Sequence, residues 1–229
     1  MKDRFEYVDW EEVRPVKIEL NTINQRMASF IRNNCPELRF DPELVGSAER
    51  GLVTRIIDGS KGFDLDYNLI INHPGFNESW DAKVVKECFM DAVNYAVEGT
   101  DYSHAKDSTR AITIKKVDSE NSRINYSCDY AIIYYEEDGY SYLHNNKKGG
   151  VYSFNHRDLK YPIAEMEKII WDYAEYPEDW IREEYLKVKN SDRDNKPSFT
   201  LYIETLYNIL NTINQIEGAE SAIRTITFL

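Results

Sequence analysis

The nine residues from Phe63 to Ile71 read FDLDYNLII, and polar and apolar side chains alternate over the first part of this stretch. Such alternation is typical of a β-strand, in which side chains two residues apart share one face. Asp64 and Asp66 should therefore present both carboxylates on the same face. Two ionised carboxylates side by side repel one another, and burying either of them alone is costly. A divalent cation would relieve both costs, since Mg²⁺ prefers carboxylate oxygens as protein ligands.

A third carboxylate lies in a second apolar stretch, NYSCDYAIIYY, which runs from residue 125 to residue 135. Asp129 comes just before Ala131, Ile132 and Ile133, a run that predicts a buried strand beside the first one. Three aspartates on neighbouring strands are the smallest set that a two-metal phosphoryl-transfer site requires. The simpler alternative is a solvated strand entrance at Asp64 and Asp66 and a water-facing edge position at Asp129.

A glycine and a serine, Gly46 and Ser47, lie upstream of the aspartate pair in a segment rich in small residues. We expect this segment, residues 44–62, to be a loop with a short helical turn inside it. A Gly-Ser turn that leads into a helix offers backbone N–H groups and a hydroxyl to a phosphate. Taken alone, the pair would indicate only an ordinary turn, so its meaning depends on the aspartates that follow.

The remaining pattern predicts an α+β chain. Helical spacing of apolar residues occurs over about 16–33 and 85–96, and a turn is expected at Pro74-Gly75. Further strands are predicted at 110–117, 140–146 and 151–157, with a hairpin turn at Asp138-Gly139. From Pro162 onward the pattern is helical. We therefore expect a mixed β-sheet with helices on one side in a catalytic core of residues 1–160, followed by a helical C-terminal domain of residues 161–229.

Composition narrows the classes of protein further. The 229 residues include 42% hydrophobic residues and only 10 Gly and 7 Pro, which excludes a disordered or collagen-like chain. Lys and Arg number 28 against 40 Asp and Glu, a net charge of −12 that makes binding of long nucleic acids unfavourable. Three cysteines without a CxxC motif predict no disulfide framework and a reducing, cytoplasmic compartment. No stretch of 18 apolar residues occurs, so no membrane association is expected.

The segments GSAERG, FDLDYNLII and SCDYAII occur in that order along the chain. In this respect the sequence resembles the nucleotidyltransferases of the DNA-polymerase-β type, whose signature is a Gly-Ser loop, an Asp-x-Asp strand and a third Asp on a later strand. The strand RAITIKKV, the hairpin after Asp129 and the segment from Pro197 to Leu206 are similar to the branch that contains the oligoadenylate synthetases, the cyclic GMP-AMP synthases and the bacterial CD-NTase-like enzymes.

The resemblance implies a reaction. A nucleoside monophosphate would pass from a nucleoside triphosphate to an acceptor hydroxyl, with release of pyrophosphate. Asp64, Asp66 and Asp129 would be the catalytic residues and would hold two Mg²⁺ (or Mn²⁺) ions, and Asp129 would also take the proton of the attacking hydroxyl. The negative charge of the chain favours a nucleotide or a small molecule as the acceptor.

The resemblance also implies nucleotide-binding residues. Gly46 and Ser47 would hold the β- or γ-phosphate. Ser198 would touch the triphosphate, and Phe199 would stack on the base. Lys187 and Lys189 are both candidates for neutralising the triphosphate, and the sequence does not choose between them.

Two other functions fit parts of the pattern. The first is a catalytically degenerate nucleotidyltransferase fold that binds a nucleotide or a partner without turnover. The second is a metal-dependent phosphohydrolase, but such enzymes usually add histidine ligands. The four histidines, His73, His104, His144 and His156, show no ligand spacing relative to the aspartates.

Overall fold

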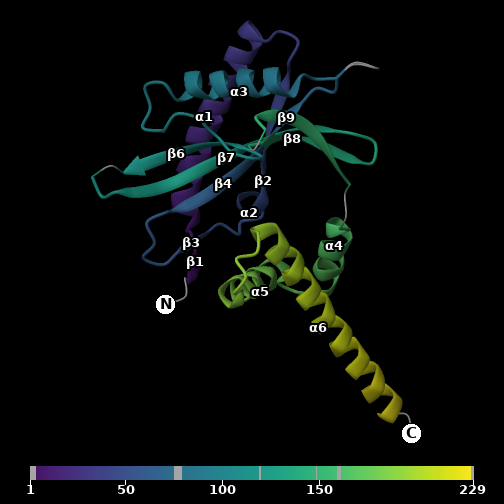
Figure 1. Ribbon diagram of the computed structural model, residues 1–229. Coiled ribbons are helices and arrows are strands. Elements are labelled where there is room, and N and C mark those ends of the chain that lie inside the picture. The colour runs from purple at the N-terminus through teal and green to yellow at the C-terminus, as the bar shows by residue number, and fades with distance from the viewer. Residues whose placement is uncertain (1–3, 75–78, 119, 148, 159–160, 228–229) are drawn as a thin grey trace. The chain divides into compact units, whose positions relative to one another are not determined.

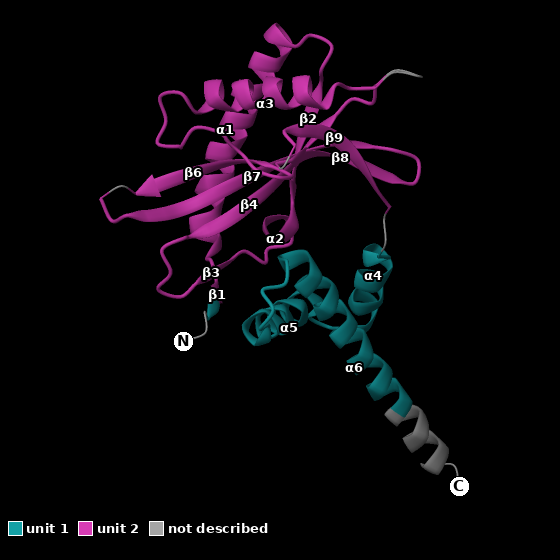
Figure 2. Ribbon diagram, in the orientation of Figure 1, with its two compact units in different colours: residues 1–5, 160–229 teal, residues 6–159 magenta. Residues whose placement is uncertain are grey.

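The computed structural model describes residues 4–74, 79–118, 120–147, 149–158 and 161–227, with side chains described as far as residue 218. The chain divides into two compact units, coloured separately in Figure 2. One unit is Glu6–Leu159, and the other joins Met1–Phe5 to Lys160–Leu229. Gly75 of the turn predicted at Pro74-Gly75 lies outside the described residues.

The first unit is built on a mixed seven-stranded sheet. The order β2-β4-β7-β6-β5 forms its main path, and β8 pairs with both β7 and β9. Among the described strands of this sheet, only β4 and β7 run parallel and the other pairs are antiparallel. The strands are β2 (Phe40–Val45), β4 (Phe63–Ile71), β5 (Lys106–Asp107), β6 (Ile112–Asp118), β7 (Arg123–Tyr135), β8 (Gly139–Asn146) and β9 (Val151–Asp158). A separate two-stranded sheet pairs β1 (Phe5–Tyr7) with β3 (Thr54–Ile56).

Two helices, α1 (Trp10–Asn34) and α3 (Ala82–Val97), pack on one face of the sheet (Figure 1). Every second residue of β4, starting from Phe63, is buried and joins the same apolar core as these helices. The intervening residues of β4 lie on the other face and are exposed or half-buried. The predicted fold class, a mixed sheet with helices on one side followed by a helical part, is confirmed.

A buried ion pair fastens α3 to the edge of the sheet. Lys86 is 2% exposed, and its ammonium lies 2.9 Å from the Asp107 carboxylate on β5 and 3.1 Å from the Ala111 carbonyl oxygen. Asn145 and Tyr152 donate hydrogen bonds of 2.6 and 2.7 Å to the other oxygen of Asp107. Burial lowers the pKa of Lys86, and the carboxylate of Asp107 opposes that shift. The charged pair is thus held by partners from three strands or loops.

The cysteines depart from the sequence-based expectation. Cys35, directly after α1, forms a disulfide with Cys88 in α3, while Cys128 stays a free, buried thiol in β7. The prediction that no disulfide would form was wrong because it rested on spacing along the chain. The two cysteines are 53 residues apart in sequence and meet only when the two helices pack on the same face of the sheet.

The second unit is helical and consists of α4 (Ile163–Tyr173), α5 (Pro177–Ser191) and α6 (Ser198–Thr227). Its core includes Ile170, Tyr185 and Leu206, each at most 1% exposed. The N-terminal segment is tied to this unit, because the amide of Phe5 donates to the Asn190 side chain at 2.8 Å and its carbonyl oxygen accepts from the same side chain at 3.1 Å. Across the described part of the chain, no helix combines the length and the apolar character that crossing a bilayer requires.

Candidate active site

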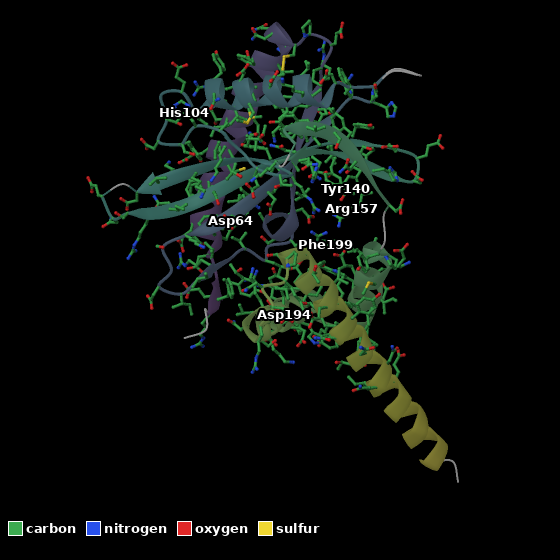
Figure 3. The ribbon with its side chains drawn as sticks, in the orientation of Figure 1. Asp64, His104, Tyr140, Arg157, Asp194 and Phe199 are labelled. Carbon is green, nitrogen blue, oxygen red and sulfur yellow. A yellow bond between two sulfur atoms is a disulfide. The ribbon has the colours of Figure 1, made fainter. Side chains whose placement is uncertain are left out.

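The carboxylates of Asp64 and Asp66 share the face of β4 that lies opposite the helices (Figure 3 labels Asp64). Their neighbours Phe63, Leu65 and Tyr67 are buried on the helix side, so the alternation anchors the strand and turns both aspartates outward. Asp64 is exposed and Asp66 is half-buried. The sequence prediction that the pair would share one face is confirmed.

The third aspartate lies beside the pair. Strand β7 runs parallel to β4, and the register places Asp129 opposite Asp66 and Ser127 opposite Asp64. Neighbouring strands are separated by about 4.8 Å, so Asp66 and Asp129 are direct lateral neighbours on the same face. Parallel pairing brings the two residues to the same level although 62 residues of chain lie between them. The expected adjacency of the two aspartate strands is thus observed.

Strand β6 completes a small grid of polar side chains. It pairs antiparallel with β7, with Thr113 opposite Asp129 and Lys115 opposite Ser127. Two rows therefore cross the strands β4, β7 and β6: one row is Asp64, Ser127 and Lys115, and the other is Asp66, Asp129 and Thr113. Within these rows, two acidic residues face one another directly only at Asp66 and Asp129.

Two hydroxyl groups in the grid donate hydrogen bonds to the carboxylates of Asp64 and Asp129. The Ser127 hydroxyl donates a hydrogen bond to Asp64 Oδ1, and the Thr113 hydroxyl donates one to Asp129 Oδ1. Among the described residues, the carboxylate of Asp66 has no hydrogen-bond donor and no cationic partner. Neither hydroxyl was singled out from the sequence. Their signal was the strand period, because Ser127 lies two residues before Asp129 and Thr113 lies in the predicted RAITIKKV strand.

The loop that contains Gly46 and Ser47 lies against Asp66. Strand β2 ends at Val45, which pairs with Asp66, and Gly46 opens the short helix α2 (Gly46–Glu49). Gly46 adopts φ +71°, and a Cβ atom placed on it would lie 3.1 Å from Asp66 Oδ2. At this φ value, glycine is the residue that lets the backbone approach the carboxylate so closely. Within the described structure, the half-buried Ser47 hydroxyl makes no hydrogen bond.

The electrostatics of the three aspartates are unequal. Burial, together with the negative charges of Asp129 and Asp64, raises the pKa of Asp66 to about 6. Burial also raises the pKa of Asp129, although the Thr113 hydrogen bond and the positive charge of Lys115 work against this shift. The ammonium of Lys115 has no hydrogen bond or ion pair with any described residue. The site therefore concentrates negative charge that the protein itself only partly neutralises.

The donor set suits a divalent cation. Three carboxylates on one face, one of them lacking a protein partner within the described structure, match the oxygen ligands that Mg²⁺ and Mn²⁺ prefer. These carboxylate oxygens are spaced more widely than the ligand atoms of a second group, Asp138, His156 and Asp158, which all lie within 4.8 Å of one another. That second group is exposed, so its charges are well solvated.

The predicted nucleotide-binding residues of the helical unit lie at the start of α6. Ser198 and Phe199 are both exposed. The Phe199 ring, 50% exposed, lies edge-to-face against the Tyr161 ring, with the ring centroids 6.2 Å apart. The Lys189 ammonium lies 3.5 Å from the Ser198 hydroxyl. Lys187 instead forms an ion pair of 2.9 Å with Glu184. These residues belong to the other compact unit, so their part in the site stays a prediction.

The chain is similar to known proteins in structure but not in sequence. No protein-family model matches the sequence, and no curated protein matches it either. The fold is similar to a mutant of the di-nucleotide cyclase DncV from Vibrio cholerae, in complex with ATP and GTP, with a TM-score of 0.64 and 12% sequence identity over 90% of this chain and 70% of that one.

Two other solved structures extend this likeness. The CD-NTase CdnG from Bradyrhizobium diazoefficiens, in complex with GTP, has a TM-score of 0.53 and 12% identity over 85% of this chain and 65% of that one. CdnC from E. coli MS115-1, with ATP, has a TM-score of 0.50 and 12% identity over 90% of this chain and 62% of that one. The resemblance inferred from the sequence is therefore confirmed for the fold: the chain has the nucleotidyltransferase fold of the bacterial CD-NTases.

Proposed function

We propose that the protein is a metal-dependent nucleotidyltransferase. It would transfer a nucleoside monophosphate from a nucleoside triphosphate to the hydroxyl of a nucleotide or small-molecule acceptor, releasing pyrophosphate. The observation that carries the proposal is the direct apposition of Asp66 and Asp129 on parallel strands, with Gly46 packed against Asp66. The likeness to di-nucleotide cyclases and CD-NTases that were solved with ATP or GTP supports the same reading.

Asp64, Asp66 and Asp129 would bind metal in this reaction, and Asp129 would also act as the general base. Asp64, Asp66 and Asp129 would hold two divalent ions, which when bound would neutralise the triphosphate and make the acceptor hydroxyl more acidic. Asp129 would accept the proton of that hydroxyl as its oxygen forms a bond to the α-phosphorus. The bond from the α-phosphorus to the bridging oxygen would break, and pyrophosphate would leave in line.

The nucleotide-binding residues that the sequence predicts keep their proposed roles. The Ser47 hydroxyl has no hydrogen bond within the described structure, so it is available for the β- or γ-phosphate. In the helical unit, the 3.5 Å separation between the Lys189 ammonium and the Ser198 hydroxyl favours Lys189 over Lys187 as the cation for the triphosphate. The exposed ring of Phe199 would stack on the base, a contact worth about 1–3 kcal/mol in nucleic-acid complexes.

The test is pyrophosphate release from each of the four common ribonucleoside triphosphates, with Mg²⁺ or Mn²⁺ and with nucleotides offered as acceptors. We expect release by the wild-type protein and its loss in Asp129→Asn, which keeps the size of the side chain. Asp101→Asn, at an exposed aspartate outside the grid, is the matched control and should retain activity. Nucleotide binding without release under every condition would instead support the degenerate binding protein.

A further inference from the structure

The two hydroxyl groups that flank the aspartates have a common arrangement. Ser127 lies opposite Asp64 across the parallel β4–β7 pair, and Thr113 lies opposite Asp129 across the antiparallel β6–β7 pair. Each hydroxyl donates to the Oδ1 atom of the carboxylate that it faces. In both cases the Oδ2 atom has no hydrogen bond among the described residues, so one oxygen each of Asp64 and Asp129 is left for a ligand.

These contacts fix side chains that would otherwise be free to turn. Asp64 is exposed, and the described residues offer its carboxylate no other donor. Repulsion from Asp66 would drive the carboxylates of Asp64 and Asp129 away from it. A donor that is itself carried on a central strand, with its backbone in the sheet ladder, opposes that movement. The hydroxyls thus supply the supporting hydrogen bonds that carboxylate ligands of metals usually receive.

On this basis, and resting on the proposed function, we propose that Ser127 and Thr113 are positioning residues: they hold Asp64 and Asp129 in the orientation that binds divalent metal. Neither residue touches the reacting atoms. Their contribution is to the affinity of the protein for the metal. Loss of such a supporting contact typically weakens metal binding by roughly 10-fold to 100-fold.

The direct test is a titration of the full chain with Mn²⁺ alone, in which free Mn²⁺ is measured by electron paramagnetic resonance. Thr113→Val removes the hydroxyl and keeps the branched shape, and Ser127→Ala removes the other hydroxyl. We expect each change to weaken Mn²⁺ binding by about tenfold. Thr113→Ser, which retains the hydroxyl, should bind Mn²⁺ within about twofold of wild type on this scheme. Thr22→Val, at an exposed helical position outside the site, is the control for a change of this kind.

A second readout separates positioning from a general loss of structure. Pyrophosphate release by Thr113→Val should need more Mn²⁺ to reach half of its maximum, while kcat at saturating Mn²⁺ should approach the wild-type value. Equal Mn²⁺ affinity in wild type, Thr113→Val and Ser127→Ala would overturn this inference and leave the proposed function standing. A wild-type protein that binds no Mn²⁺ would overturn both. Weak binding in Thr113→Ser equal to that of Thr113→Val would also count against the role of the hydroxyl.

Discussion

Replacing Asp66 with Asn should stabilise the metal-free protein at neutral and alkaline pH. The carboxylate of Asp66 is half-buried, lies beside Asp129 and has no partner within the described structure, so its charged form is disfavoured in the folded state. Its pKa is raised from 3.8 to about 6. A shift of about two units, at about 1.4 kcal/mol per unit, corresponds to about 3 kcal/mol.

The sign of this effect depends on pH. Because the folded state binds the proton of Asp66 more tightly than the unfolded chain, the wild-type protein loses stability as pH rises from about 4 to about 6. Above that window the full cost of about 3 kcal/mol is present, and at pH 4 only about 0.5 kcal/mol of it is. Asp66→Asn carries no charge at either pH. Its advantage over wild type should therefore be large at pH 8 and small at pH 4.

Thermal unfolding in the presence of EDTA measures this difference. For a chain of this length about 3 kcal/mol corresponds to a rise in Tm of roughly 6–12 °C at pH 8. Asp101→Asn, at an exposed aspartate outside the grid, should leave Tm unchanged. Addition of Mn²⁺ should raise the Tm of wild type but not that of Asp66→Asn. Equal stability of Asp66→Asn and wild type in EDTA at pH 8 would refute the electrostatic reasoning, as would an equal gain at pH 4.

Three further changes test other parts of the structure. Lys86→Met removes a buried ammonium and leaves its carboxylate partner unpaired, so the free energy of unfolding should fall by about 3 kcal/mol in urea titrations; an unchanged midpoint would contradict the buried ion pair. Gly46→Ala places a Cβ atom where φ is +71° and where Asp66 Oδ2 would lie 3.1 Å away, so it should cost about 1–2 kcal/mol and weaken Mn²⁺ binding; wild-type Mn²⁺ affinity would refute the close approach. Reduction of the disulfide between Cys35 and Cys88, which are 53 residues apart in sequence, should lower stability by about 4 kcal/mol; a wild-type Tm as insensitive to reductant as that of Cys35→Ser would show that no disulfide is present.

The central strand could be predicted closely because its pattern and its environment agree. Strand β4 begins at Phe63 and ends at Ile71, the bounds predicted from the alternation and the apolar end of FDLDYNLII. The edge strand β2 was not predicted; Pro42 lies inside it, and proline is unfavourable in most strands. Proline is tolerated there since β2 lies at the edge of the sheet and pairs with β4 alone. Helix α1 likewise starts before the predicted Val16, with Pro15 inside it.

The site was only partly within reach of the sequence. Local spacing shows that Asp64 and Asp66 share a face, and the apolar run after Asp129 indicates a strand. The partners of these residues depend on the register between strands, which the spacing of residues along the chain does not reveal. The hydrogen bond from Thr113 to Asp129 joins residues 16 apart, and that from Ser127 to Asp64 joins residues 63 apart. Pairs of this kind follow from the sheet and cannot be read from spacing.

The parallel pairing of β4 with β7 has a consequence for how such a protein can diverge. What places the carboxylates together is the register of two backbones, and that register is set by the pattern of apolar residues on the covered side. Substitutions that keep this apolar pattern therefore leave Asp64, Asp66 and Asp129 in place. One residue inserted in β7 before Asp129 would instead turn its side chain to the covered side. The likeness to solved structures agrees with this, since it is found at 12% identity by superimposing backbones and not by comparing sequences.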